Sequence, residues 1–366
     1  MRRRNLFAAL CLVVGLLVGA SVAQAGPTVA IVKADNHQLV AETWKLDVLD
    51  FTKQWEALWT KEGEAAIERM VREAVKLAGG WPVKPGDTVA ILTNLVQDLW
   101  YVVSTGKAPN AEYANKFIQS MVVDARVVRA LAVMAKESGA KKVIIATGPN
   151  AGDAHAAYLT YGYTRMAREI GAELYDVNEG PWKTYKAPYG LALPNYTLPA
   201  PIVEADVRIS VGPLKTHQLA GVTMTLKNWA IGIPPSRVYG AIKLGLPHPK
   251  MAKVVADVHS IAKPNYAVIG GIWGMEGNGP TMGEPVPMDV IIAGADPVAV
   301  DSVGAQVMGF NPDDFGTIRL PKEYGIGTNE GILVVGRSIA EVARKFQPPP
   351  ENVRAPGAWA EVSGWK

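Results

Sequence analysis

The feature that most constrains this chain is a repeated order of apolar run, loop and amphipathic helix. Runs at Thr28–Lys33, Thr88–Leu92 and Lys142–Thr147 are bounded by turn residues, and each predicts a buried strand. Apolar residues at helical spacing over 62–77 and 125–138 predict the helices between them. Strands that alternate with helices favour a parallel sheet covered by helices on its faces, which is an α/β fold.

The same order returns in the second half of the chain, and 366 residues are enough for two domains. Strands are predicted at 206–211, 266–269, 290–293 and 332–335, with helices at 249–262 and 297–308. We therefore expect two Rossmann-like α/β units with mainly parallel sheets and an inter-domain cleft. The expected parts are a signal peptide (1–25), a first α/β domain with a helical insertion (26–200), a second α/β domain that carries the main motifs (201–340) and an extended tail (341–366).

The first 25 residues are typical of an export signal. Arg2, Arg3 and Arg4 precede an apolar stretch over 6–22, and Ala23-Gln24-Ala25 forms a small-residue cleavage site. We expect cleavage near Ala25, a periplasmic or secreted mature protein, and no stable membrane span after processing. The paired arginines also make the chain a candidate for twin-arginine export, with a general secretory signal as the alternative.

Removal of this segment changes the charge and the cysteine content. The segment holds three of the 37 basic residues and no acidic residue, so 34 basic and 34 acidic residues remain. A neutral chain gives no electrostatic support for nucleic-acid binding. The single cysteine, Cys11, is also removed. We therefore expect no cysteine-ligated iron–sulfur cluster or zinc in the mature protein.

The richest polar segment, 211–235, follows a predicted strand. It carries Lys215, His217, Thr223, Thr225, Lys227 and Asn228 among apolar neighbours. Lysine supplies charge, threonine and asparagine supply neutral donors, and histidine carries a proton near neutral pH. Ligands of parallel sheets bind beyond the carboxyl ends of the strands. Asn94 and Asn150, which follow two other strands, are therefore expected in the same site. A loop of solvated lysines is the alternative.

Two further segments are candidates for the same cleft. His248 begins a predicted helix, where a neutral imidazole could ligate a metal, or it could simply cap the helix. A glycine-dense loop is predicted over 270–280, where Gly277 and Gly279 would allow a ligand close to the backbone. Glu276 in this loop is a tentative second metal ligand, or else a turn residue.

Two aspartates of the predicted helix 297–308 have supporting roles. Asp296 precedes Pro297 and is expected to cap the helix. Asp301 lies among valines and alanines, and a carboxylate in such surroundings needs a partner. We expect that partner to be a lysine of segment 211–235.

Three motifs occur in register along the chain. They are Pro213-Leu214-Lys215-Thr216-His217 with Val222-Thr223-Met224-Thr225-Leu226-Lys227-Asn228, then Gly274-Met275-Glu276-Gly277-Asn278-Gly279-Pro280, and Ala293-Gly294-Ala295-Asp296-Pro297-Val298-Ala299-Val300-Asp301. In their order and spacing they resemble the DUF362 family, a domain of unknown function. The biochemical role of that family is poorly defined. Many of its members append a cysteine-rich ferredoxin module that this sequence lacks. Leu92-Thr93-Asn94 stands where the family has Lys-Pro-Asn.

A more distant resemblance is to the nickel-pincer lactate racemase family. His217, Lys227 and His248 follow a strand at comparable places. The resemblance implies that His217 moves a proton, that Lys227 holds the cofactor and that His248 ligates nickel. The chain departs from that family at Ala146-Thr147-Gly148-Pro149-Asn150, where Ala-Thr-Gly-Thr-His is expected.

Together these observations predict an exported protein that binds a small carboxylate- or phosphate-bearing ligand in the cleft, with a metal or metal cofactor as an open option. Proton transfer is assigned to His217, with Lys227 beside it. An enzyme of this kind would be isomerase- or racemase-like, or associated with redox chemistry. The alternative is a non-catalytic periplasmic protein that binds an anion or a metal, or assists a redox complex. The substrate and the oligomeric state remain open.

Overall fold

The computed structural model describes residues 26–45, 58–96, 110–150 and 153–351. Most of its strands belong to one sheet. These strands are β1 (Thr28–Lys33), β4 (Thr88–Leu92), β5 (Lys142–Thr147), β6 (Glu173–Asp176), β9 (Val207–His217), β10 (Gly221–Thr223), β11 (Tyr266–Glu276), β12 (Glu284–Gly294) and β13 (Leu333–Gly336). They run in the order β13-β1-β12-β11-β9-β4-β5-β6, with β10 paired to β9. The predicted bounds of β1, β4 and β5 are confirmed.

The sheet is mostly parallel, which confirms the α/β class. The pairs β1–β13, β11–β9, β9–β4, β4–β5 and β5–β6 are parallel, whereas β12 and β10 run antiparallel to their neighbours. The two-unit arrangement is not confirmed. Strand β9, expected in the second unit, pairs with β4 of the first, and β1 pairs with β12 and β13. The two predicted halves therefore share one continuous sheet.

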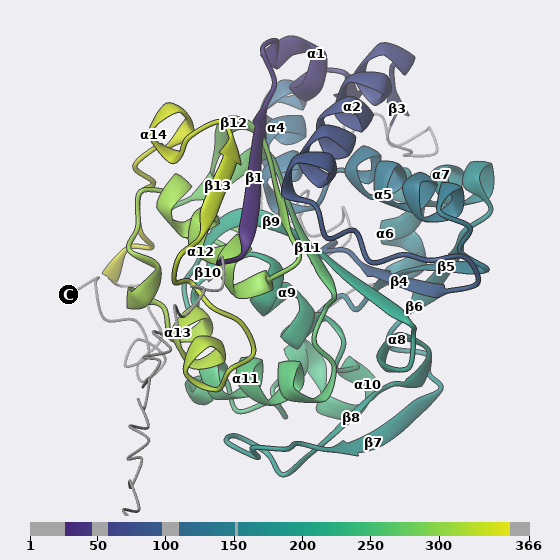
Figure 1. The fold of residues 1–366 in the computed structure, drawn as a ribbon, viewed down its shortest axis with the longest axis vertical. Helices are drawn as coiled ribbons and strands as arrows, with labels where there is room; N and C mark the ends of the chain where they lie inside the picture. Colours follow the sequence, from purple (N-terminus) through teal and green to yellow (C-terminus); the bar gives the residue numbers. More distant parts are fainter. Residues whose placement is uncertain (1–25, 46–57, 97–109, 151–152, 352–366) are drawn as a thin grey trace, which may run out of the picture.

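Helices cover both faces of this sheet (Figure 1). One face is covered by α2 (Lys61–Ala78), α4 (Ala111–Met121), α5 (Ala125–Glu137), α6 (Ala154–Thr160) and α7 (Tyr163–Ile170), whose apolar side chains form one core cluster. The other face is covered by α9 (Thr225–Gly232), α11 (Met251–Ile261), α12 (Pro297–Val307) and α13 (Gly316–Glu323), which belong to a second cluster. The alternation of strands and helices thus buries apolar side chains on both sides of the sheet.

Short elements complete the described chain. They are the helices α1 (His37–Ala41), α8 (Ala200–Val203), α10 (Ser236–Tyr239) and α14 (Ile339–Val342), three 3-10 turns (Ala241–Lys243, His248–Lys250 and Pro312–Asp314), and two hairpins, β2 (Trp44–Lys45) with β3 (Leu58–Trp59) and β7 (Trp182–Lys186) with β8 (Asn195–Pro199). The hairpin β7–β8 extends along one end of the molecule (Figure 1).

No helix is predicted between the strand at Thr88–Leu92 and the helix expected over 125–138, but the structure has one there. Residues 97–109 lie outside the described part, but Ala111–Met121 forms helix α4, which Asn110 caps through a hydrogen bond from Tyr113 N (2.8 Å). The helix forms because Ala114, Phe117 and Met121 recur at helical spacing and are fully buried. The helical spacing of these apolar residues is the sequence signal that identifies helix α4.

The loop predicted over 270–280 is also wrong for most of its length, because β11 continues to Glu276. Glycines fit here because β11 lies between β9 and β12 in the middle of the sheet. A Cβ atom at Gly271 would lie 3.0 Å from Val290 Cγ2, and one at Gly274 would lie 2.7 Å from Phe346 Cζ. The glycine density therefore reflects close packing around a central strand.

Two predictions concern the ends of the chain. The signal peptide over 1–25 lies outside the described residues and stays a prediction. Of the predicted tail, residues 343–350 have no regular structure, and Phe346 is buried while its N–H donates to Met308 O (3.0 Å). None of the helices in the described ranges combines the length and apolar character that crossing a bilayer requires.

The chain order places a topological switch point between β4 and β9. After β4 the chain proceeds outward through β5 and β6, and after β9 it proceeds in the opposite direction to β11. The connecting helices accordingly lie on opposite faces, with α5 after β4 and α9 after β9. Such a point leaves a crevice at the carboxyl ends of the two strands, where doubly wound proteins bind ligands.

Candidate functional site

A cavity of about 30 Å³ lies at this switch point. Its walls come from residues that follow β4 and β5, from the end of β9, from β10 and from α9. Six of the residues predicted to bind a ligand line it: Asn94, Asn150, Lys215, Thr223, Lys227 and Asn228. About 10–15 Å³ by this measure holds one water molecule. The space therefore suits a small anion or the anionic group of a larger molecule.

Lys215 extends from β9 into the interior of the protein. Its side chain is fully buried, and its Nζ donates to Met121 O (2.7 Å) and to Asn94 Oδ1 (3.3 Å). Asn94 in turn donates to Asn228 Oδ1 (2.9 Å), and Asn228 donates to Val211 O (3.0 Å). This network joins the ends of β4 and β9 to helix α9. Burial strongly lowers the pKa of Lys215, and the charge of Lys227 lowers it further.

Lys227 and Thr223 also line the cavity. Thr223 is paired with Lys215 in the β9–β10 hairpin, and its Oγ1 is buried without a hydrogen-bond partner. Lys227 is 8% exposed, and burial lowers the pKa of its amine to about 8. A buried hydroxyl without a partner is costly. These two side chains thus offer the cavity a charge and a neutral donor.

Lys243 was missed by the sequence analysis. It is fully buried, although its neighbours Ile242 and Leu244 are 49% and 66% exposed. Two successive residues with positive φ, Ile242 (47°) and Lys243 (57°), turn its side chain inward. Its Nζ donates to the carbonyls of Ile231 (2.6 Å), Gly148 (2.9 Å) and Gly232 (3.1 Å), all of which line the cavity. The available signal was a lone lysine within an apolar loop.

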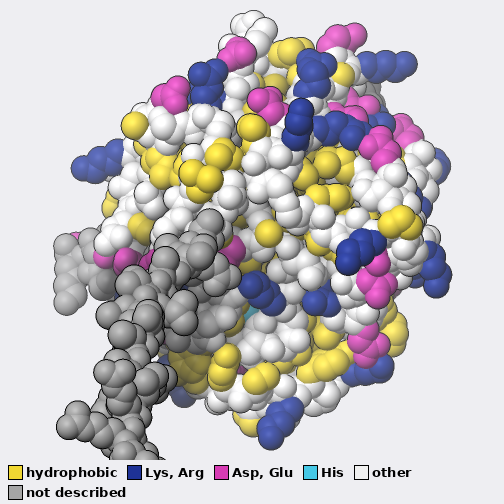
Figure 2. Space-filling view, in the orientation of Figure 1, with side chains coloured by type: hydrophobic (Ala, Val, Ile, Leu, Met, Phe, Trp, Pro, Cys, Tyr) yellow, Lys and Arg dark blue, Asp and Glu magenta, His cyan; other side chains and the backbone are white. Residues whose placement is uncertain are grey.

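Two of the three buried amines, Lys215 and Lys227, line the cavity, and the third, Lys243, donates to carbonyls of its wall. Burial is the main reason that the pKa of Lys243 falls to about 7, and the charge of Lys227 lowers it further. In the described ranges none of these amines forms an ion pair with a carboxylate. At the surface, by contrast, basic side chains do have acidic partners. Lys and Arg side chains lie beside Asp and Glu over α2 and α5 (Figure 2), including Arg72 with Glu137 (2.7 Å). Buried charge without a counter-ion is costly.

His217 ends β9 behind this cavity and does not line it. The side chain is 5% exposed, and its Nδ1 accepts from Leu219 N (2.9 Å) and Ala220 N (3.2 Å). Burial lowers the pKa of His217 well below its ordinary value, and the charges of Lys227 and Lys215 lower it further. The imidazole is therefore neutral near pH 7, and since Nδ1 is an acceptor, its proton lies on Nε2.

Gly277 and Gly279 pack against the end of β9 instead of lining the cavity. Thr216 Oγ1 donates to Gly277 O (2.9 Å), and Gln218 N donates to Gly279 O (2.9 Å). A Cβ atom at Gly279 would lie 2.1 Å from Thr216 O, so only glycine fits there. The neighbouring Pro280 does line the cavity. The segment therefore closes one side of the site.

Asp301 has a different partner from the one predicted. Its carboxylate, 2% exposed, accepts from the backbone N–H groups of Thr225 and Leu226 (both 2.9 Å) and from the Thr225 hydroxyl. These are neutral donors at the first turn of α9, and the prediction of a lysine partner is wrong. Asp296 caps α12 as expected by accepting from Val298 N (2.8 Å). Both aspartates thus hold helices near the site.

His248 and Glu276, the tentative metal ligands, each have another partner. His248 Nδ1 lies 2.8 Å from Leu246 O, and Glu276 Oε2 accepts from Gln347 N (2.8 Å). Neither belongs to the group of three metal-ligating side chains found among the described residues. Their role as metal ligands stays a prediction.

A glycine at the cavity wall supports a first test. Gly148 follows β5, and a Cβ atom there would lie 2.2 Å from Gly232 O, which also accepts from Lys243. We expect Gly148→Ala to lower the free energy of unfolding by about 1–3 kcal/mol, because backbone must move to relieve the overlap. Urea unfolding measures this loss. Gly270→Ala is the matched control, since its Cβ would meet nothing closer than 3.5 Å. Equal losses in both variants would contradict the packing described.

The fold and the cavity define a doubly wound α/β protein with a lysine-lined cavity at its switch point. Residues 108–306 match the family described as "Domain of unknown function (DUF362)", and the chain belongs to this family. A thylakoid-associated protein of Synechocystis sp. is 24% identical over 246 residues, which cover 67% of this chain and 70% of that protein. No solved structure matches.

Proposed function

We propose that the protein binds a small anion, a carboxylate or a phosphate group, in the cavity at the switch point. The observation that carries the proposal is the pair of buried amines, Lys215 and Lys227, that line one small cavity and form no ion pair with a carboxylate of the described residues, with a third buried amine, Lys243, bound to the cavity wall. Thr223 adds a buried hydroxyl without a partner. An anion would offset the cost of burying the charges and would accept from the hydroxyl.

The charge state of Lys227 sets the expected pH range. Because its pKa is about 8, the amine is mainly charged at pH 7 and mainly neutral at pH 9.5. An anion stabilises the charged form, so binding should draw a proton onto Lys227. Affinity is therefore expected to fall as the pH rises above 8.

Calorimetric titration with inorganic phosphate and, separately, with acetate tests the proposal. We expect at least one anion to bind at pH 7 and to bind more weakly at pH 9.5. Lys227→Met should raise the Kd at least tenfold, which is about 1.4 kcal/mol. Lys84→Met is the control, because Lys84 is exposed. The absence of binding by both anions, or equal Kd values for Lys227→Met and the wild type, would refute the proposal.

The chemistry proposed for His217 is narrower than the general acid and base role expected from the sequence. Its Nδ1 is occupied by two backbone donors, and the proton on Nε2 makes the ring a hydrogen-bond donor. These contacts support a positioning role, in which His217 fixes the turn after β9 beside the cavity that it does not itself line. They favour the binding function over a two-base racemisation, for which a free basic nitrogen is needed.

A further inference from the structure

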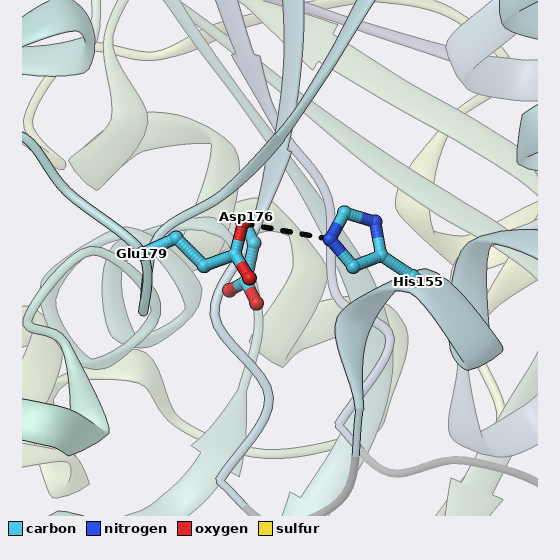
Figure 3. Close-up of side chains that lie close together, drawn as sticks. All are labelled: His155, Asp176 and Glu179. Carbon is cyan, nitrogen blue, oxygen red and sulfur yellow. Dashed lines mark ion pairs between the residues drawn. The ribbon is translucent and has the colours of Figure 1, made fainter.

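A second polar cluster lies at the same edge of the sheet, outside the cavity. His155 is in the first turn of α6, Asp176 ends β6, and Glu179 lies in the turn that follows (Figure 3). One ligand atom from each of the three side chains lies within 4.8 Å of the others. His155 Nε2 and Glu179 Oε2 are 3.5 Å apart. An imidazole and two carboxylates thus converge on one point.

The backbone holds these three groups together. Strands β5 and β6 are parallel neighbours, with Thr147 opposite Asp176, so the segments that follow them emerge side by side. Asp153 caps α6 by accepting from His155 N (2.7 Å), which positions the start of the helix. Asp176 Oδ1 accepts from Asn178 N (2.8 Å), which shapes the turn that leads to Glu179. The convergence therefore follows from the sheet order and two local hydrogen bonds.

The charge of the cluster favours a cation. Within the ranges that the structure describes, neither Asp176 nor Glu179 forms an ion pair with a lysine or arginine, and His155 is the basic partner. Burial raises the pKa of Asp176, and the charges of Glu179 and Asp153 contribute to the rise, whereas His155 opposes it. The carboxylates repel one another when no cation lies between them.

We propose that His155, Asp176 and Glu179 bind one divalent transition-metal ion. An imidazole with two carboxylates suits Mn²⁺, Fe²⁺ or Zn²⁺ better than Ca²⁺ or Mg²⁺, which prefer oxygen ligands alone. Bonds of about 2.1 Å allow ligand atoms up to about 4.2 Å apart, so a small side-chain movement closes the site. The side chains of His155 and Glu179, 61% and 50% exposed, are free to make that movement.

Three protein ligands leave coordination positions open to water or to an anion. The cluster also interacts electrostatically with Lys243 at the cavity wall. The charge of Asp176 raises the pKa of Lys243 and so counters part of the lowering that burial causes. The segment between β5 and His155 contains Gly148 and Asn150, which line the cavity. A bound metal would add positive charge to this edge of the sheet. The metal proposal rests on the three ligands alone and does not require the anion to bind.

Titration of the full chain with MnCl₂ in phosphate-free buffer tests the proposal, with electron paramagnetic resonance reporting free Mn²⁺ and calorimetry reporting heat. We expect one Mn²⁺ per chain, and an at least tenfold higher Kd in His155→Ala and in Glu179→Gln. Both side chains are exposed, so the variants should fold, which thermal unfolding checks. His37→Ala is the matched control, because His37 pairs with Asp289 beside β1, far from β6 in the strand order.

The outcomes separate clearly. Loss of binding in both variants with retention in His37→Ala supports the site. Absence of Mn²⁺ and Zn²⁺ binding by the wild type, or equal Kd values in the wild type and both variants, would overturn it. Binding of Mg²⁺ as tight as that of Mn²⁺ would overturn the assignment to a transition metal. Phosphate titration of His155→Ala is independent of these results, so failure of the metal site is distinguishable from failure of the anion cavity.

Discussion

Between pH 7 and pH 10, the free energy of unfolding of the wild type should rise by about 3.5 kcal/mol relative to that of Lys243→Met. The pKa of Lys243 is about 7 in the folded protein, against an ordinary value of 10.5. In this pH range the unfolded chain binds the proton that the folded chain has released, so stability rises with pH. The expected slope is about 1.4 kcal/mol per pH unit.

Urea unfolding of both proteins at several pH values measures this difference. The free-energy cost of burying the charged Lys243 amine is fully present below pH 7. This cost falls at higher pH, because the buried amine loses its proton. Lys84→Met is the control and should follow the wild type, because Lys84 is exposed. A free energy of unfolding of the wild type that does not rise relative to that of Lys243→Met between pH 7 and pH 10 would show that Lys243 keeps an ordinary pKa.

Asp301→Ala should lower the free energy of unfolding by about 2–4 kcal/mol, since each buried donor left without a partner costs about 1–3 kcal/mol. The substitution removes the acceptor of two backbone N–H groups and of the Thr225 hydroxyl at the start of α9. Helix α9 carries Lys227 and Asn228, so its displacement should also weaken anion binding. Urea unfolding at pH 8 and phosphate titration measure the two effects.

The pH dependence of Asp301 has the opposite sign from that of the lysines. Burial raises the pKa of Asp301 to about 7 despite its three hydrogen bonds. A raised carboxylate pKa stabilises the fold at low pH, and this contribution is lost as the pH rises through 7. Wild type should therefore lose stability relative to Asp301→Asn between pH 4 and pH 7.

For Asp301→Ala, a loss of less than about 0.5 kcal/mol in the free energy of unfolding would show that α9 does not depend on this carboxylate.

Local patterns predicted the elements better than their assembly. Strands β1, β4 and β5 were predicted to the residue, because short apolar runs between turn residues carry their own signal. The pairing of β9 with β4, which makes one sheet out of two expected units, joins segments more than 100 residues apart. Strand pairing at that distance depends on long-range packing, for which periodicity contains no information. The extension of β11 through its glycines was missed for the same reason, because it depends on the pairing of β11 with β9 and β12.

The candidate site was predictable where it followed from strand ends. Six predicted residues line one cavity because the carboxyl ends of parallel strands meet at one edge. Lys243 could not be found this way, because two residues with positive φ turn it inward from a loop. His217 was predicted beyond a strand that ends at residue 211, whereas β9 continues to His217, and its hydrogen bonds to Leu219 and Ala220 depend on the tight turn that follows.

The most direct test of the central claim is a crystal structure at pH 7 of protein soaked in arsenate, a heavier analogue of phosphate. The account predicts an anomalous-difference peak in the cavity, about 4 Å from Lys227 Nζ, because one As–O bond and one hydrogen bond separate the arsenic atom from the amine. Lys227→Met crystals should lack this peak and keep any surface peaks. Arsenate peaks confined to surface lysines in wild-type crystals, with water alone beside Lys227, would contradict the claim that the buried amines form an anion site.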